Sequence, residues 1–486
     1  MSSLSQAQDY LAKGEHLAAS RLFHELLKQP LSEHDKGFTY LGLGELALIQ
    51  GDARDAEQLI NHACGYLSGQ TKPLALLARV YNLLGAHEDA LMVLNYANQI
   101  APDSAELRYQ LGIQQVLMGE PMQAKSHFLL AINDLLIDSA KMDSKEIAKQ
   151  RPVAMIPTDA VELGADCLLA LARLGHLVTD RHDELIALLI YLKRTNSLIT
   201  DACSLSINVK LAYAEAQLQS IYNQQDATSY FEAANKLQYP LTPCKTEEQI
   251  LVSQSVRGFI SADSLVLQAN TNQFSPIFVI ALPLGGFQIL RKTLLSMGNC
   301  HVHQEASSAT QAVLDEAYRL TAKHFPRCVT DLNQVQLNEL AKRYLVKLSQ
   351  YKSHEDEIPQ DNAEGADLTR PFIELSAADA QALPLLMKLF PNAKVIHLNR
   401  ELAPHTQEVI QHYFANSPAY LCDAKEFAAF RDEYLKLIGC WKVLMPNCFL
   451  TLNVEDLALS PKGSQDLIFD FCNLSKGDNG ENTKLA

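Results

Sequence analysis

A glycine turn after a short apolar run is the first feature of the sequence that suggests chemistry. Residues Pro276–Leu282 are apolar over the length of one strand, the letters PLGG follow at 283–286, and an apolar, cationic stretch of helical character comes next. A strand, a glycine turn and a helix N-terminus are the parts of an anion cradle, because backbone N–H groups converge there. The stretch 274–295 therefore predicts a phosphate-binding loop.

The side chains that usually complete such a cradle are scarce in this chain. A phosphate site normally adds a Lys or Arg and hydroxyl groups directly after the glycines, whereas Phe287 and Gln288 stand here. The nearest cations, at 291 and 292, lie about one turn further along the predicted helix. The candidate contacts to a nucleotide at this loop are Pro283, Gly285, Gly286, Gln288 and Arg291.

A second group of reactive side chains lies in residues 300–305, which read CHVHQE. The carboxylate of Glu305 is a candidate general base, and the alternative is a solvated loop residue. His301 and His303 alternate in the same segment, but no third metal ligand is apparent nearby. We therefore predict no metal site.

Arg400 ends another apolar run and is the candidate cation for a second phosphate. Eight residues later the chain has Glu408, an anion, where a phosphate would have to be bound. The alternative role of Arg400 is a salt bridge within the domain, for example with Glu401 or Glu305. Both interpretations stay open at this point.

The elements that must position these residues alternate between strand and helix after residue 275. Strands are predicted at Pro276–Leu282, Pro371–Leu375, Lys394–Leu398 and Cys448–Val454. Helices are predicted at Leu290–Met297, Thr310–Phe325, Leu332–Ser349, Ala377–Phe390, His405–Phe414 and Ala424–Leu444, the last with Trp441 in the core. This alternation predicts an α/β domain with a mainly parallel sheet and a ligand site at the C-terminal strand ends.

The N-terminal half contains an internal repeat. Gly14, Gly51, Gly85 and Gly119 recur at spacings of 37, 34 and 34 residues. Five and nine residues after them come small and large apolar residues, which are Ala19, Ala56, Ala90 and Ala124, and then Phe23, Ile60, Leu94 and Phe128. Such a pattern predicts pairs of short antiparallel helices, because the small residues let two helices approach and the large ones fill the groove.

This pattern resembles the tetratricopeptide repeat, with four repeats over residues 1–135. The resemblance implies a concave surface for a protein or peptide partner; a spacer or a dimerisation element is the alternative. Residues 136–250 are predicted to form an irregular helical extension, and residues 251–273 a linker helix that continues the helical pattern of Thr246–Phe259. The helices predicted in the extension are Asp159–Gly175, Asp183–Lys193, Ile207–Leu218 and Ala227–Leu237.

Composition narrows the class of protein. A length of 486 residues implies more than one domain. The net charge of −15 argues against a nucleic acid or an anionic membrane as partner. We find no apolar run long enough for a signal peptide or a membrane span. The ten cysteines are scattered without a CxxC pair, so we expect a cytoplasmic protein with reduced, mostly buried thiols.

Several segments, in order, resemble bacterial sulfotransferases with N-terminal tetratricopeptide repeats, which are related to tyrosylprotein sulfotransferases. Residues 276–290 are similar to the family's 5′-phosphosulfate loop, PIFIVGxPRSGTTL, and LFPNAKVIHLNR at 389–400 to its LFPxARIIHxRR stretch. VEDL at 454–457 and LIFDFCNL at 467–474 are similar to its YEDLxxDPEG and LLxFxGL elements. The resemblance implies a tetratricopeptide-repeat solenoid, then an α/β P-loop-like sulfotransferase domain at 274–478 and a disordered tail at 479–486.

The resemblance also implies a reaction, the transfer of a sulfuryl group from 3′-phosphoadenosine 5′-phosphosulfate to a hydroxyl group of a peptide, sugar or small molecule. Glu305 would then be the general base and Arg400 would bind the 3′-phosphate. The sequence departs from the family at the donor site, however. Leu-Gly-Gly-Phe-Gln at 284–288 replaces Arg-Ser-Gly-Thr-Thr, Glu408 replaces a Ser, and ELSAAD at 374–379 replaces Asp-Lys-x-Pro-x-Asn. The family also continues further beyond its counterpart of residue 474.

The affinity for the sulfuryl donor that these replacements remove can be estimated from the missing hydrogen bonds. Removing the loop Arg and several hydroxyls takes away roughly 4–7 kcal/mol, which is about 10³–10⁵ in affinity. The sequence therefore predicts a non-catalytic or strongly diverged family member, a pseudoenzyme that acts as a protein-interaction scaffold. The alternatives are an active sulfotransferase with a rearranged donor site, or another nucleotide-dependent activity in the same cleft.

Overall fold

The computed structural model describes residues 3–50, 52–84, 86–135, 157–200, 203–222, 224–261, 265–270, 275–295, 301–304, 307–349, 372–375 and 379–472. They form two compact units by their internal contacts. The N-terminal unit comprises Met1–Leu241 and, in addition, Gln411–Tyr413. The C-terminal unit comprises Thr242–Ile410 and Phe414–Ala486.

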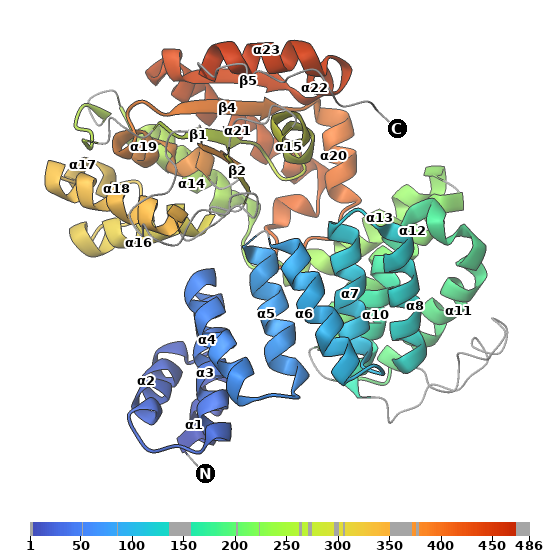
Figure 1. The fold of residues 1–486 in the computed structure, drawn as a ribbon. Coiled ribbons are helices and arrows are strands. Elements are labelled where there is room, and N and C mark those ends of the chain that lie inside the picture. The colour runs from blue at the N-terminus through green and yellow to red at the C-terminus, as the bar shows by residue number, and fades with distance from the viewer. Residues whose placement is uncertain are drawn as a thin grey trace, which may run out of the picture. The chain divides into compact units, whose positions relative to one another are not determined.

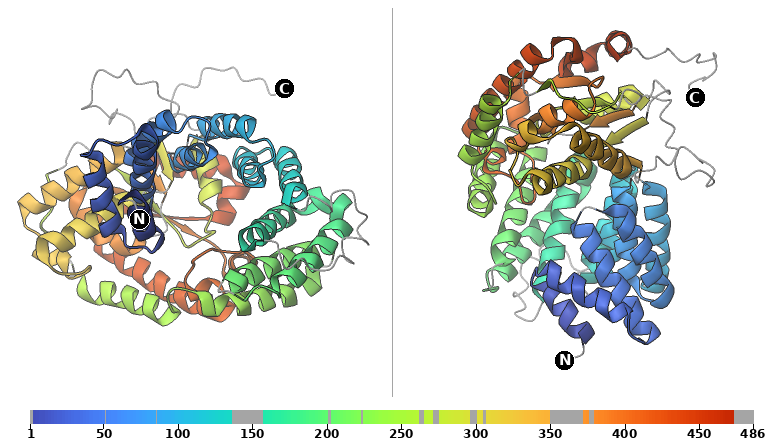
Figure 2. Two further views of the ribbon diagram at one scale, coloured as in Figure 1. Left: turned by 90° about the horizontal axis from the view of Figure 1, so that it is seen from below. Right: turned by 90° about the vertical axis from the view of Figure 1, so that its left-hand side faces the viewer.

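The described part of the N-terminal unit is built from helices. They are α1 (Ser3–Ala12), α2 (His16–Leu27), α3 (Glu33–Ile49), α4 (Ala53–Tyr66), α5 (Thr71–Leu83), α6 (His87–Ile100), α7 (Ala105–Leu117), α8 (Pro121–Leu135), α10 (Thr158–Arg173), η1 (Gly175–Arg181), α11 (His182–Asn196), α12 (Cys203–Tyr222), α13 (Gln224–Gln238) and η2 (Tyr239–Leu241). Successive helices pack in pairs, α3 with α4, α5 with α6, α7 with α8 and α12 with α13 (Figures 1 and 2).

The small and large residues of the repeat pattern are buried in these helix pairs. The alanines at 19, 56, 90 and 124 are fully buried, and so are the large apolar residues that follow them, with at most 2% exposed. A Cβ atom on Gly112 would lie 2.4 Å from the ring of Phe128, and one on Gly44 would lie 2.5 Å from Ile60. These helices therefore approach as closely as they do because one side has no side chain. Gly51 and Gly85 lie outside the described residues.

The C-terminal unit contains a sheet with the strand order β2-β3-β1-β4-β5, in which each neighbouring pair is parallel. The mainly parallel sheet is confirmed, and each of the four predicted strands overlaps an observed one. The structure has one further strand, β2, in the CHVHQE segment, where we predicted no strand. The strands are β1 (Ile277–Ile280), β2 (His301–Gln304), β3 (Phe372–Leu375), β4 (Lys394–Asn399) and β5 (Phe449–Asn453).

Helices cover both faces of this sheet (Figure 1). One face packs against α15 (Phe287–Leu295), α22 (Val454–Leu459) and α23 (Pro461–Cys472). The other face packs against α14 (Thr246–Phe259), α16 (Ser307–Thr321), α17 (Cys328–Asp331), α18 (Gln334–Ser349), α19 (Asp379–Leu389), α20 (Leu402–Ile410), η4 (Ala419–Leu421) and α21 (Ala424–Leu444). A short helix, η5 (Pro446–Cys448), precedes β5.

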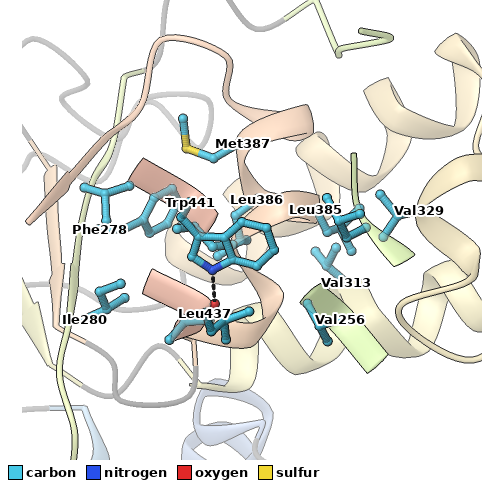
Figure 3. Close-up of a cluster of buried hydrophobic side chains, with 14 of the residues drawn as sticks. Val256, Phe278, Ile280, Val313, Val329, Leu385, Leu386, Met387, Leu437 and Trp441 are labelled. Atoms are coloured by element: carbon cyan, nitrogen blue, oxygen red, sulfur yellow. Dashed lines mark hydrogen bonds between the residues drawn. The ribbon is translucent and has the colours of Figure 1, made fainter. Parts of the chain in front are cut away.

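The side chains of β1 divide between these two cores, as expected for a strand buried on both faces. Phe278 and Ile280 belong to the larger core, whereas Ile277 and Val279 belong to the smaller one. Trp441 lies in the larger core with its side chain fully buried, which confirms its predicted position (Figure 3). Its indole N–H donates a hydrogen bond to the backbone oxygen of Ala380 at 2.9 Å.

The prediction of mostly buried cysteines was wrong. Among the nine described cysteines, all of which are free thiols, only Cys167, Cys328 and Cys422 are buried, and Cys203 is exposed. The remaining five are partly exposed. Of these, Cys64 lies on α4 and Cys440 on α21. None of the described helices has both the length and the apolar character of a membrane span.

Candidate functional site

The loop between β1 and α15 forms a tight turn that only glycine can complete. The N–H of Gly285 donates to the backbone oxygen of Leu282 at 2.8 Å, and a Cβ atom on Gly285 would lie 2.5 Å from that same oxygen. Gly286 has a φ of +98°, and a Cβ atom on it would lie 2.5 Å from Val454. Both glycines are therefore required by the turn and by its packing against α22, whether or not a ligand binds.

Leu284, between Pro283 and Gly285 in this loop, adopts a φ of 57°, in the left-handed region that L-residues rarely occupy. Such a conformation costs of order 1–3 kcal/mol and persists where surrounding contacts hold it. The contacts that hold it come from the residue directly after β4 and from α20. They bind the backbone carbonyl groups of the loop.

Arg400 and His405 are the two side chains that bind these carbonyl groups. Arg400 Nη1 donates to the oxygen of Leu284 at 2.8 Å, and His405 Nε2 lies 2.7 Å from the oxygen of Pro283. Because a carbonyl only accepts, His405 carries its proton on Nε2. Burial lowers the pKa of His405, so the ring is neutral at pH 7. The loop is thus held by one cation and one neutral donor.

The second edge of the Arg400 guanidinium is also occupied. Its Nη2 lies 2.5 Å from Glu408 Oε2, one and a half turns into α20, and the Arg400 side chain is only 20% exposed. Arg431 Nη2 in turn donates to the backbone oxygen of Arg400 at 2.8 Å. The salt-bridge alternative is therefore observed, with Glu408 as the partner; of the two partners named as examples, Glu305 lies outside the described residues. The N–H of Glu401 instead donates to Glu455 at 3.1 Å.

The first turns of α15 add little charge to the loop. Phe287 is half-buried and packs against the core formed by α15, α22 and the sheet. Gln288 is exposed and Arg291 is half-buried. Of the candidate nucleotide contacts, Arg400 reaches the loop through the backbone oxygen of Leu284, which lies between Pro283 and Gly285 in the chain. Gln288 and Arg291 follow on the helix.

The candidate base Glu305 lies outside the described residues. The same holds for the side chains of His301 and His303, of which only the backbone in β2 is described. Glu374, which begins the ELSAAD segment, has no exposed surface, and its carboxylate accepts a hydrogen bond from the Tyr344 hydroxyl. Glu374 therefore points into the larger core, where it pairs with a tyrosine.

Sequence reasoning missed two buried histidines near the site. His405 was included only as the first residue of a predicted helix. His397, on β4, is 2% exposed, and neither of its ring nitrogens has a hydrogen-bond partner among the described residues. Burial, with the charges of Lys442 and Arg431, lowers the pKa of His397 to about 3. A histidine inside an apolar strand run, as in KVIHLN, is the signal that could have identified it.

Comparisons with known proteins identify the C-terminal region. Residues 276–478 match the model of the sulfotransferase family, so this part of the chain carries a sulfotransferase-family domain. A comparison with curated proteins finds no match. Among solved structures, the chain is similar to the sulfotransferase STF1 from Mycobacterium tuberculosis H37Rv, with 13% identity over 73% of this chain and 90% of that chain. The TM-score is 0.28, and a similarity of this size supports no statement about the site.

Proposed function

We propose that the protein is a tetratricopeptide-repeat member of the sulfotransferase family that acts as a protein-interaction scaffold and no longer binds the sulfuryl donor tightly. The observation that carries this proposal is the ion pair between Arg400 and Glu408, with 2.5 Å between Nη2 and Oε2. In the family that the sequence resembles, the arginine at this position binds the 3′-phosphate. Here its charge is already neutralised. A cytoplasmic location and a bacterial origin remain predictions from the sequence.

Electrostatics supports this reading of the pair. A phosphate at Arg400 must either displace Glu408 or bind beside its carboxylate. Displacing the half-exposed carboxylate breaks its ion pair with Arg400, and binding beside it places two like charges next to each other, so both routes weaken the binding of a phosphate.

The loop supports the same conclusion. The carbonyl groups of Pro283 and Leu284 face Arg400 and His405, so these two donors serve the loop itself. Phe287 stands at the first position of α15, where the resembled family has a threonine hydroxyl. A donor nucleotide would find neither the cation nor the hydroxyl groups that the transfer requires.

The scaffold role is supported by a row of exposed apolar side chains on the N-terminal unit. Ile49, Leu83 and Leu117 are the last residues of α3, α5 and α7 and follow one another at intervals of 34 residues. Their exposed fractions are 54%, 38% and 51%. Apolar side chains exposed at the same position of successive helix pairs are typical of a surface that a partner covers.

Calorimetry tests the donor site. We expect no heat when 3′-phosphoadenosine 5′-phosphate is titrated to millimolar concentration into the wild-type protein. The Glu408→Ser variant, which frees the Arg400 guanidinium, should gain measurable binding, and Arg400→Ala should abolish that gain. Micromolar binding by the wild type that is lost in Arg400→Ala would contradict the proposal.

A matched set of substitutions tests the scaffold. A variant with Ile49, Leu83 and Leu117 all changed to Ser should lose the partners that the wild type retains in a crosslinking pull-down. The control changes three still more exposed apolar residues of the C-terminal unit to Ser, namely Val335, Val443 and Leu459. Equal loss in both variants, or retention in both, would count against a partner surface on these helices.

A second candidate function is an active sulfotransferase. The match of residues 276–478 to the family model favours it, and Arg291 in α15 would be the cation recruited to the donor. Glu305 would act as the base. Transfer of labelled sulfate to a hydroxyl-bearing peptide, lost in both Arg291→Ala and Glu305→Gln, would support this candidate over the scaffold.

A further inference from the structure

The N-terminal unit contains three residues that come from far along the chain. Residues Gln411–Tyr413 directly follow α20, yet their contacts assign them to the N-terminal unit. Arg173 Nη2, at the end of α10, donates to the backbone oxygen of Tyr413 at 3.0 Å. Gln217 Nε2, on α12, donates to the backbone oxygen of Gln411 at 3.0 Å. Two side chains therefore bind two main-chain carbonyl groups that are two residues apart.

The ring of Tyr413 also contacts side chains of the N-terminal unit. The ring of Tyr413 lies 5.4 Å from that of Tyr213, at an interplanar angle of 57°. The Arg173 guanidinium lies 6.0 Å from the centroid of the Tyr413 ring. Tyr413 is half-buried against the helical core. Aromatic and cation–π contacts of this kind each contribute modestly but select for an aromatic side chain.

The side chains on α10 and α12 around this segment are themselves held by hydrogen bonds. The hydroxyl of Tyr213 forms hydrogen bonds with Asn235 and Gln238, both at 2.7 Å, and its side chain is almost fully buried. Lys210, one turn before Tyr213 on α12, bonds Glu162 and Asp166 of α10 at 2.8 and 2.9 Å. The two helices are thus locked together at this place, which makes the site preorganised.

We propose that Gln411–Tyr413 is an internal ligand of the N-terminal unit, and that a partner peptide with an aromatic side chain binds here by replacing it. The hydrogen bonds from Arg173 and Gln217 reach main-chain oxygens, which any extended peptide offers. The ring contacts supply the requirement for an aromatic residue. The inference deepens the proposed scaffold function and rests on it, because it names the chemical class of a partner.

A binding experiment with the full-length protein tests this inference. The probe is a fluorescein-labelled peptide with the sequence of residues 410–415, IQHYFA, followed by fluorescence anisotropy. In the Tyr413→Ala variant the internal ligand is weakened, so the probe should bind about tenfold more tightly than to the wild type. The same peptide with alanine in place of its tyrosine should bind neither protein.

Matched variants keep the result interpretable. Tyr413→Phe retains the ring and should behave as the wild type. Tyr413→Leu keeps the apolar volume, so it serves in place of Tyr413→Ala if that variant does not fold. Adding Arg173→Gln to the weakened background should reduce probe binding again.

Two outcomes would overturn the inference. One is equal affinity of the probe for the wild type and for the Tyr413 variants, and the other is no binding to any of them. Neither outcome involves the nucleotide or the row at Ile49, Leu83 and Leu117. The proposed function therefore stands or falls separately.

Discussion

The two units bury different kinds of polar side chain. Among the described residues of the N-terminal unit, the buried polar groups are hydroxyls and amides, namely Thr39, Gln114, Gln115, Thr195, Asn196, Asn235 and Gln238. The C-terminal unit buries acids and bases as well. These are Glu374, Lys388, His397, His405 and Glu433, each with at most 3% exposed.

The difference indicates what each core depends on. Amides and hydroxyls do not titrate in the physiological range, and Gln114 Nε2, for example, donates to the backbone oxygen of His87 at 2.7 Å. The N-terminal core therefore depends mainly on shape. Buried ionisable groups need specific partners, as Glu433 has in Arg257 at 2.7 Å, so the C-terminal core also depends on charge and pH. Four predictions test this comparison.

The largest expected loss of stability comes from disturbing the fit between two helices of the N-terminal unit. Gly112→Ala places a Cβ atom 2.4 Å from the buried ring of Phe128. We expect a loss of about 3 kcal/mol in the free energy of unfolding, measured by urea denaturation, because the helix pair must separate. The control is Gly65→Ala, at a helix position with open space around the new Cβ. It should leave stability unchanged or raise it by up to about 1 kcal/mol.

A glycine of the C-terminal loop should respond less strongly. Gly286→Ala combines an unfavourable φ of +98° with a contact of 2.5 Å to Val454. We expect destabilisation by about 2 kcal/mol in the same assay. The double variant with Val454→Ala relieves the contact but adds a cavity and keeps the φ strain, so it should not recover wild-type stability. Full recovery would show that contact alone fixes this glycine.

Acid should weaken the C-terminal unit through His397. Its pKa is about 3 in the folded chain and about 6.5 in the unfolded chain, so only the unfolded state takes up a proton between these values. The histidine's contribution is complete above pH 6.5 and falls by about 1.4 kcal/mol per pH unit below it. Urea midpoints between pH 6.5 and 5.5 should fall less steeply in His397→Phe. An unchanged slope would contradict this origin.

The smallest effect is expected at the ion pair of the candidate donor site. Glu408 is half-exposed, so Glu408→Gln should cost only about 0.5 kcal/mol in low salt and less in high salt. Asp9→Asn, which breaks the more exposed pair with Lys13, is the control. A loss of several kcal/mol in Glu408→Gln would mean that the pair is part of the core after all.

The sequence predicted the secondary structure well wherever apolar periodicity was strong. The helices Thr246–Phe259 and Ala424–Leu444 have the predicted bounds, and the strand at Lys394 begins where expected. The strand β2 was missed because CHVHQE is polar at alternate positions, so its residues suggested chemistry instead. Its neighbour β3 provides the pairing that makes it a strand, and such non-local pairing is not visible in a short polar segment.

The site was predicted in part. The glycines and Arg400 come together as expected, since a motif after a strand fixes their place. The partner of Arg400 could be suspected, because Glu408 lies eight residues later in the sequence. The role of His405 could not be read from the sequence, because it depends on the backbone oxygen of Pro283, more than a hundred residues away in the chain. Backbone acceptors carry no sequence signature.

The assignment of Gln411–Tyr413 to the N-terminal unit has a consequence for how the protein is made. A ribosome that has finished Leu241 must add about 170 more residues before Tyr413 exists, which takes roughly 10–30 s at about 5–20 residues per second. During that interval Arg173, Tyr213 and Gln217 have no internal ligand. On the role proposed above for this segment, a peptide with an aromatic side chain has its best access to the unit before synthesis ends.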